Sequence, residues 1–190
     1  MNREGLLTME KIDEVTRMCA REHPIYEQIS SFSIALYVLG FFNCPDLMSF
    51  DDVDASEAAR ILKEEFTLIE AGALPADYHI SQSEDRYLLV FGDPAFPEHF
   101  AVLVDARSGK PFFSKLKFFG SGFDSLEELK DEFLGKDGVG RDDLAFYRMK
   151  RSAQVRKPAL GKIFTTKDDG YYTVFDDPTQ KHHKEANACR

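Results

Sequence analysis

Asp93, Glu98 and His99 lie within eight residues of one another, in the stretch Gly92–His99. A carboxylate beside a histidine can tune the imidazole for acid–base chemistry, and histidine titrates near neutral pH. Because the stretch separates two apolar runs, we predict a loop at one end of a sheet, where the three side chains could converge on a pocket. The alternative is that Asp93-Pro94 opens a turn and the charged groups face water.

A second group consists of basic residues with no acids among them. Leu144–Lys167 holds seven bases and no acid, whereas Asp46–Glu70 holds eight acids and two bases, a net of −6. Clustered Lys and Arg can bind phosphates, RNA or an acidic protein, or they can match the acidic stretch of the same chain or of a second copy. Because the net charge is −9, we favour a protein partner or self-association over nucleic acid. The predicted partner-binding residues are Arg148, Lys150, Arg151, Arg156, Lys157 and Lys162.

Recognisable metal and cofactor motifs are missing from the sequence. The acidic run Asp51–Asp54 lacks the glycine and the distal glutamate of a calcium-binding loop. His182, His183 and Cys189 have no fourth ligand at a closed spacing. Gly120–Gly122 precedes an expected helix but matches no phosphate-binding motif. We therefore predict no metal, no cofactor and no assigned catalytic residue.

Helical patterns dominate the first part of the chain. Thr8 is placed to cap a first helix, and apolar residues at helical spacing predict a second around residues 25–42. Asp54 and Glu57 have the spacing of a capping box, followed by an apolar stripe that runs to Ile69. Gly72 then stands where a C-terminal cap belongs, so we predict a third helix up to that glycine.

Strand patterns follow the helices. Short apolar runs at 78–81, 87–91 and 100–104, with an alternating run at 112–119, predict an antiparallel meander over about residues 77–119. The apolar character of 87–91 and 100–104 indicates that both faces of the sheet are covered, by the C-terminal segment or by a second copy. In the alternating strand, Lys115 and Lys117 should face water while Leu116 and Phe118 point inward. Gly120–Gly122 should end the sheet.

Residue patterns in the C-terminal third of the chain predict helices followed by a hairpin. Asp124 and Glu127 repeat the capping-box spacing, and a short helix is expected over 142–150. Apolar runs at 163–166 and 171–175 flank an Asp-Gly turn, which predicts a hairpin. We expect residues 1–177 to form one domain and 178–190 to be a disordered polar tail.

The cysteines and the apolar segments indicate in which cellular compartment the protein is expected. The three cysteines are odd in number and widely spaced, and the first residues do not resemble a signal peptide. The apolar run Ile34–Phe42 is too short to cross a bilayer. We therefore expect a soluble cytoplasmic protein with no membrane contact.

The segment Leu74-Pro75-Ala76-Asp77-Tyr78 resembles the LPxDY signature of SUKH-type proteins, many of which are immunity proteins against secreted toxins. Phe123–Leu129 is loosely similar to the phrase that follows the sheet in that family. The resemblance covers residues 56–134, and the family's tryptophans and its helix after the tyrosine are missing. It implies a binding role.

Taken with the charges, these patterns predict an α+β fold: an antiparallel meander packed by N-terminal helices, then one or two helices and a C-terminal β-hairpin. The leading functional hypothesis is a non-catalytic protein-binding module, such as an immunity or adaptor protein. The alternatives are a small-molecule binder or enzyme using residues 92–99, and nucleic-acid binding through residues 148–162.

Overall fold

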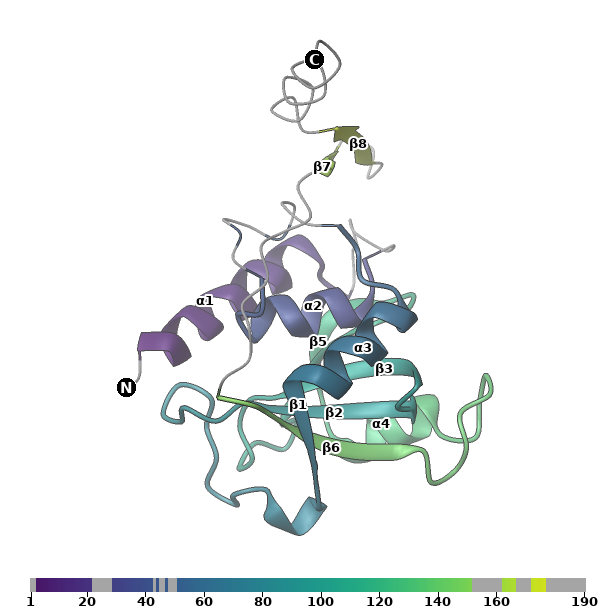
Figure 1. Ribbon diagram of the computed structural model, residues 1–190. Coiled ribbons are helices and arrows are strands. Elements are labelled where there is room, and N and C mark those ends of the chain that lie inside the picture. Colours follow the sequence, from purple (N-terminus) through teal and green to yellow (C-terminus); the bar gives the residue numbers. More distant parts are fainter. Residues whose placement is uncertain are drawn as a thin grey trace, which may run out of the picture.

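The computed structural model describes residues 3–21, 29–42, 44, 47 and 51–151, together with the backbone of strands 162–166 and 172–176. The described helices are α1 (Arg3–Met18), α2 (Ser31–Val38), α3 (Ala55–Glu65) and α4 (Leu126–Phe133), with a 3-10 turn η2 (Ala71–Ala73). The six-stranded antiparallel sheet has the order β1-β6-β2-β3-β4-β5 (Figure 1). Its strands are β1 (Phe66–Ile69), β2 (Tyr87–Asp93), β3 (Phe96–Leu103), β4 (Phe112–Leu116), β5 (Gly120–Asp124) and β6 (Leu144–Met149). The predicted α+β class is confirmed.

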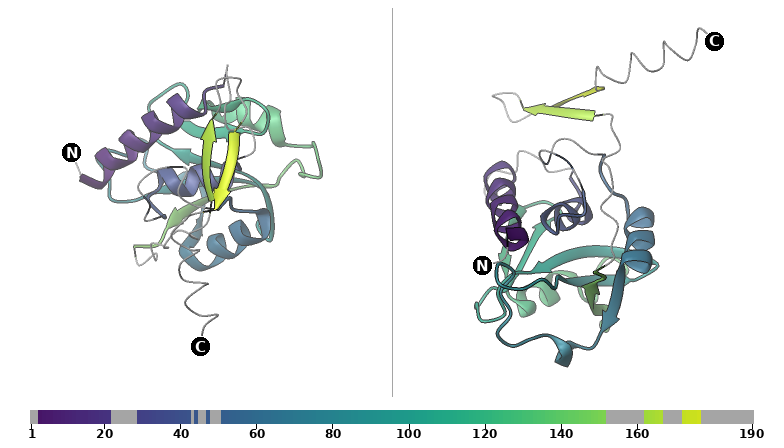
Figure 2. Two further views of the ribbon diagram at one scale, coloured as in Figure 1. Left: turned by 90° about the horizontal axis from the view of Figure 1, so that it is seen from above. Right: turned by 60° about the vertical axis from the view of Figure 1, so that its left-hand side comes forward.

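Helices cover both faces of this sheet, with α1, α2 and α3 on one side and α4 on the other (Figures 1 and 2). Phe32 of α2 packs edge-on against Phe100 of β3, with ring centroids 4.9 Å apart. The next residue back along β3, His99, points to the opposite face because strand side chains alternate. There it stacks on Phe133 of α4 at 4.2 Å. We expected the C-terminal segment or a second copy to cover this face; α4 does so.

The predicted C-terminal hairpin is present as β7 (Lys162–Thr166) and β8 (Tyr172–Asp176), which pair antiparallel from Lys162↔Asp176 to Thr166↔Tyr172. Its connecting residues and the tail 178–190 lie outside the described part of the chain.

Two segments predicted as helix are strands. The third helix was expected to continue to Ile69, but α3 ends at Glu65 and the chain goes straight into β1. The expected helix at 142–150 is β6. Tyr147 of β6 pairs with Leu68 on one side and with Leu88 of β2 on the other. This pairing on both edges overrides the local helical pattern.

The predicted N-terminal cap is correct for α3, whereas α1 and α4 begin at other residues than predicted. The Asp54 carboxylate accepts from the Glu57 N–H at 2.8 Å, as predicted. α1 begins at Arg3 and not at Thr8, which is buried inside the helix. α4 is capped by Ser125, with Glu128 completing a capping box, and not by Asp124.

The alternating strand ends earlier than predicted. β4 stops at Leu116, and residues 117–119 form the turn into β5. Lys115 was expected to face water but is only 2% exposed, because it shares the face of Phe113, against which α2 packs. Phe118, expected inward, lies in the turn and is 72% exposed. Gly120–Gly122, expected to end the sheet, belongs to β5.

Among the described helices, none combines the length and apolar character needed to cross a bilayer.

Candidate functional site

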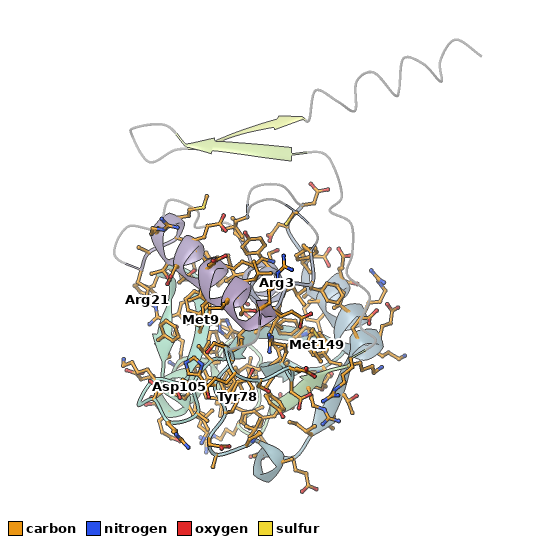
Figure 3. All side chains as sticks on the ribbon, turned by 90° about the vertical axis from the view of Figure 1, so that its left-hand side faces the viewer. Arg3, Met9, Arg21, Tyr78, Asp105 and Met149 are labelled. Atoms are coloured by element: carbon orange, nitrogen blue, oxygen red, sulfur yellow. The ribbon has the colours of Figure 1, made fainter. Side chains whose placement is uncertain are left out.

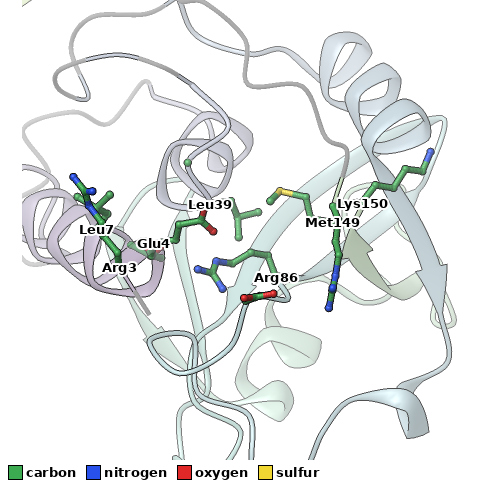
Figure 4. A pocket seen from close by; sticks show the side chains of 11 residues that line it. Arg3, Glu4, Leu7, Leu39, Arg86, Met149 and Lys150 are labelled. Atoms are coloured by element: carbon green, nitrogen blue, oxygen red, sulfur yellow. The ribbon is translucent and has the colours of Figure 1, made fainter. Parts of the chain in front are cut away.

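A pocket of about 730 Å³ opens between the first turns of α1, the end of α2, and the chain just before β2 and just after β6. Figure 4 shows it from close by. Its apolar wall is formed by Leu7, Leu39 and Met149. We call it the basic pocket, and its charged lining residues are Arg3, Glu4, Glu84, Arg86, Lys150 and Arg151.

Arg86 is the buried cation of the basic pocket, with 3% of its surface exposed. Its Nη1 donates to the carbonyl oxygens of Ser83 at 2.6 Å and Asp85 at 2.9 Å. Its Nη2 is buried and has no hydrogen-bond partner among the described residues. In Figure 4 the guanidinium points away from Met149, toward Glu4 and the first turn of α1. An unsatisfied buried donor costs about 1–3 kcal/mol, so this nitrogen would gain from an incoming acceptor.

The backbone on both sides of Arg86 is held firmly. Its carbonyl accepts from the Met149 N–H at 2.9 Å, which joins the start of β2 to the end of β6. Facing it, α1 lies against the 80–81 segment at Gly5, where an added Cβ would come within 2.5 Å of Ser81 Cα. This close approach places Arg3 and Glu4 at the mouth of the pocket.

Two of the predicted partner-binding residues, Lys150 and Arg151, line the basic pocket. Lys150 Nζ donates to the Glu64 carbonyl at 2.6 Å, and its backbone N–H donates to Glu65 at 2.8 Å. The side chain accordingly extends away from the pocket toward α3 in Figure 4. Arg151 is 77% exposed in its side chain and lies 3.7 Å from Asp85. Lys150 thus contacts the acidic stretch Asp46–Glu70, through main-chain carbonyl oxygens of α3.

The other predicted partner-binding residues are not among the described residues that line the pocket. Arg148 is exposed on β6, opposite Thr67 and Tyr87. Arg156, Lys157 and the side chain of Lys162 fall outside the described residues.

The 92–99 stretch is a tight β2–β3 hairpin with a bulge at Phe91/Gly92, and not a loop. Asp93 is exposed, and its carboxylate accepts from the Ala95 N–H at 2.8 Å within the turn. Glu98 and His99 line a cavity of about 290 Å³. The structure therefore brings two of the three predicted residues together and leaves Asp93 outside.

His99 is buried, with 2% of its surface exposed. Burial, together with the positive charges of Arg21 and Lys115, lowers the pKa of His99 to about 3. The imidazole is therefore neutral at physiological pH. Its Nε2 has no hydrogen-bond partner in the described structure.

In the described residues, no group of three or more His, Cys, Asp or Glu is arranged to hold a metal ion. Cys19 is buried and Cys44 half-buried.

Comparisons with protein-family models, curated proteins and solved structures found no match. The resemblance to SUKH-type proteins stays a prediction. Tyr78 of the Leu74–Tyr78 segment is buried and donates its hydroxyl to the Asp85 carbonyl at 3.0 Å. The residues after it form a bridge, His79↔Asp105, beside the end of β3, and Tyr78 and Asp105 lie side by side in Figure 3.

Sequence reasoning missed the residues that define the basic pocket. Arg3 and Arg86 belong to no motif and no charge cluster, and they come together only through the packing of α1 beside the start of β2. The sole sequence signal was the clustering of bases after Leu144, which pointed to Lys150 and Arg151.

Proposed function

We propose that this chain is a non-catalytic binding protein whose basic pocket receives an acidic segment of a protein partner. The observation that carries the proposal is the buried Arg86, which lines the pocket and whose Nη2 has no hydrogen-bond partner among the described residues. A carboxylate is the matching acceptor, because guanidinium–carboxylate hydrogen bonds are charge-assisted and fork-shaped.

The charges at the mouth support a carboxylate ligand. Arg3, on the first turn of α1, and Arg151, after β6, are exposed cations that line the same pocket as Arg86. They can attract an approaching anion and then hold its neighbouring groups. The resident acids Glu4 and Glu84 oppose a chain of closely spaced phosphates, which disfavours nucleic acid as the ligand.

The apolar surface beside the pocket supports a protein partner over a free small anion. Leu7 lines the pocket and is 49% exposed, and Leu6 next to it is 42% exposed. Met149 and Leu39 continue this apolar surface inward. Arginine and methionine beside exposed aliphatic side chains are typical of protein–protein contacts. An immunity or adaptor protein would be a binding protein of this kind.

The test uses a fluorescently labelled short peptide of alternating Glu and Leu, with its affinity measured by anisotropy at low salt. We expect Arg86→Met to weaken binding roughly tenfold or more, because hydrogen bonds to charged groups contribute about 1.5–3 kcal/mol. Arg3→Met, an exposed change that preserves the fold, should weaken it severalfold. Arg60→Met is the matched control, since Arg60 is an exposed arginine of α3 paired with Glu57 and Glu64.

Two comparisons separate the alternatives. A Gln-Leu peptide of the same length should bind at least about tenfold more weakly if the carboxylates matter. If Arg86→Met and Arg3→Met bind the acidic peptide as tightly as the control Arg60→Met, the proposal is refuted. Tighter binding of oligothymidylate, or of free citrate, than of the acidic peptide would favour nucleic acid or a small anion instead.

A further inference from the structure

The sheet is only narrowly joined between β3 and β4. The two strands pair at Val102↔Phe113 and Leu103↔Phe112, whereas β4 pairs with β5 at five positions. Beyond Val102, the Phe100 N–H donates to Ser31 Oγ of α2 at 3.2 Å instead of to β4. The ladder to β4 therefore covers only the last two residues of β3, and α2 supplies the acceptor for Phe100.

The 290 Å³ cavity is lined by residues from both sides of this break, and we call it the split-sheet cavity. This explains how His99 and Lys115, which point to opposite faces of the sheet, border the same space. Its main lining residues are Ser31, Phe32, His99, Lys115, Lys117 and Phe133.

Several hydrogen-bond donors border the split-sheet cavity at the start of α2. Ser31 Oγ accepts from Phe100, so its own proton remains available for donation. The N–H groups of Ser31 and Phe32 belong to the first turn of α2 and have no acceptor within the helix. The Ser30 side chain accepts from the Ser33 N–H and not from the N–H groups of Ser31 or Phe32.

His99 is the independent sign of a ligand. Its side chain borders the cavity, and its buried Nε2 has no hydrogen-bond partner in the described residues. Buried polar atoms are nearly always satisfied, so an orphaned ring nitrogen beside a cavity indicates a missing partner.

The charges at the cavity favour an anion. Lys115 is 2% exposed, and its Nζ donates to the Leu116 carbonyl at 3.3 Å. Lys117 stands at the rim, with its Nζ 3.9 Å from a Glu98 oxygen. The positive end of α2 adds to this field. The other walls are apolar and are formed by Phe32, Phe133 and Pro97.

We infer that the split-sheet cavity binds a small organic acid, with its carboxylate at Lys115 and the start of α2 and a short apolar body against Phe32 and Phe133. The volume is at the lower end of the range for small-molecule sites, which favours a ligand of about one ring over a nucleotide. This site is separate from the basic pocket, with which it shares no lining residue.

The probe is benzoate, titrated into the full chain while the amide shifts of Ser31 and Phe32 and the ring shifts of His99 are followed by NMR. We expect saturable shifts, with benzamide binding at least about tenfold more weakly because it lacks the charge, and inorganic phosphate more weakly because it lacks the ring. Lys115→Met should raise Kd roughly tenfold, and Lys117→Met about threefold. Lys110→Met is the control, since Lys110 is an exposed lysine paired with Glu128 and outside the cavity.

No saturable shift, or equal affinity for benzoate and benzamide, would overturn the inference. So would a Kd that neither lysine variant changes, or phosphate binding as tight as benzoate. If Lys115→Met does not fold, Lys117→Met and the benzamide comparison decide between these outcomes. If acidic peptides do not bind to the basic pocket, the expected binding of benzoate to the split-sheet cavity is unchanged, because the two sites share no lining residue.

Discussion

Arg21 and Asp124 form a two-point ion pair that joins the chain just after α1 to the last residue of β5. Arg21 Nη1 donates to Asp124 Oδ1 at 2.6 Å, and the Asp124 side chain is only 6% exposed. Next to the pair, the Ser121 N–H of the edge strand β5 donates to the Cys19 carbonyl. The end of α1 therefore protects one edge of the sheet from pairing with another chain.

Asp124→Asn should lower the free energy of unfolding by about 1–3 kcal/mol, because it leaves a partly buried guanidinium without its counter-charge. Urea unfolding at pH 7 measures the loss. Asp131→Asn, an exposed change of the same type on α4, should cost less than about 0.5 kcal/mol. Equal losses for the two variants would show that the ion pair adds nothing to stability.

Gly120 has a φ of +68° and lies so close to the chain after α1 that an added Cβ would be 2.5 Å from the Ala20 carbonyl oxygen. Gly138, with a φ of +86°, has no atom within 4 Å of the same position. Both alanine variants bear the backbone cost of about 1–2 kcal/mol, but only Gly120→Ala adds a clash with backbone. We expect Gly120→Ala to be the less stable by at least about 1 kcal/mol, as measured by thermal unfolding. Equal melting temperatures would contradict the contact.

His99 should make the protein sensitive to acid. Its pKa is lowered to about 3, so between pH 6.5 and 3 the unfolded chain binds a proton that the folded chain does not. Stability contributed by the neutral ring is therefore complete above pH 6.5 and falls as pH drops, by up to about 1.4 kcal/mol per pH unit. The charged groups around the ring are Arg21 and Lys115, with Glu98 and Lys117 also lining the cavity.

The measurement compares urea unfolding of the wild type and His99→Phe at pH 7 and pH 4.5. A phenyl ring can keep the stacking on Phe133 without titrating, so the variant should lose less stability on acidification. His79→Asn is a control histidine change outside the cavity. Parallel losses in wild type and His99→Phe would exclude this role for His99.

Tyr78 and Arg86 donate to the same carbonyl oxygen, that of Asp85, at 3.0 Å and 2.9 Å. Tyr78→Phe alone should cost only about 0.5–1.5 kcal/mol, because Arg86 still serves the carbonyl. Combined with Arg86→Met, the loss should exceed the sum of the two single losses by about 1 kcal/mol, since the acceptor is then left unsatisfied. Additive losses in this double-mutant cycle would show that the two donors act independently.

Local sequence was a good guide wherever an element is determined by neighbouring residues. The Asp54 cap, the apolar cores of β2 and β3, and the C-terminal hairpin follow from capping chemistry, burial on both faces and an Asp-Gly turn. It failed where distant contacts decide. Phe66–Ile69 continues a helical stripe and becomes a strand because β6 pairs with it, and Gly120 and Gly122 sit in a strand because the chain near Arg21 packs against them.

The candidate sites were only partly accessible from sequence for the same reason. Lys150 and Arg151 stood out as part of a charge cluster, and Glu98 and His99 as an acid–imidazole neighbour pair. Arg86 and Lys115 had no such signal, since Arg86 follows the acids Glu84 and Asp85, and Lys115 lies in an alternating pattern that predicted a water-facing side chain. Their burial depends on α1 lying beside the start of β2 and on the narrow β3–β4 junction, which no local pattern encodes.

The position of β6 affects how the chain folds during synthesis. β6 is the last of the six strands in sequence, yet it lies between β1 and β2, with Phe66 opposite Met149. Until the ribosome has released residue 149, β1 has no partner and the outer edge of β2 stays unpaired. At about 5–20 residues per second, the nascent chain carries this open edge for several seconds after β2 emerges. During that time the apolar β2 strand would be the segment most exposed to mispairing with a neighbouring chain.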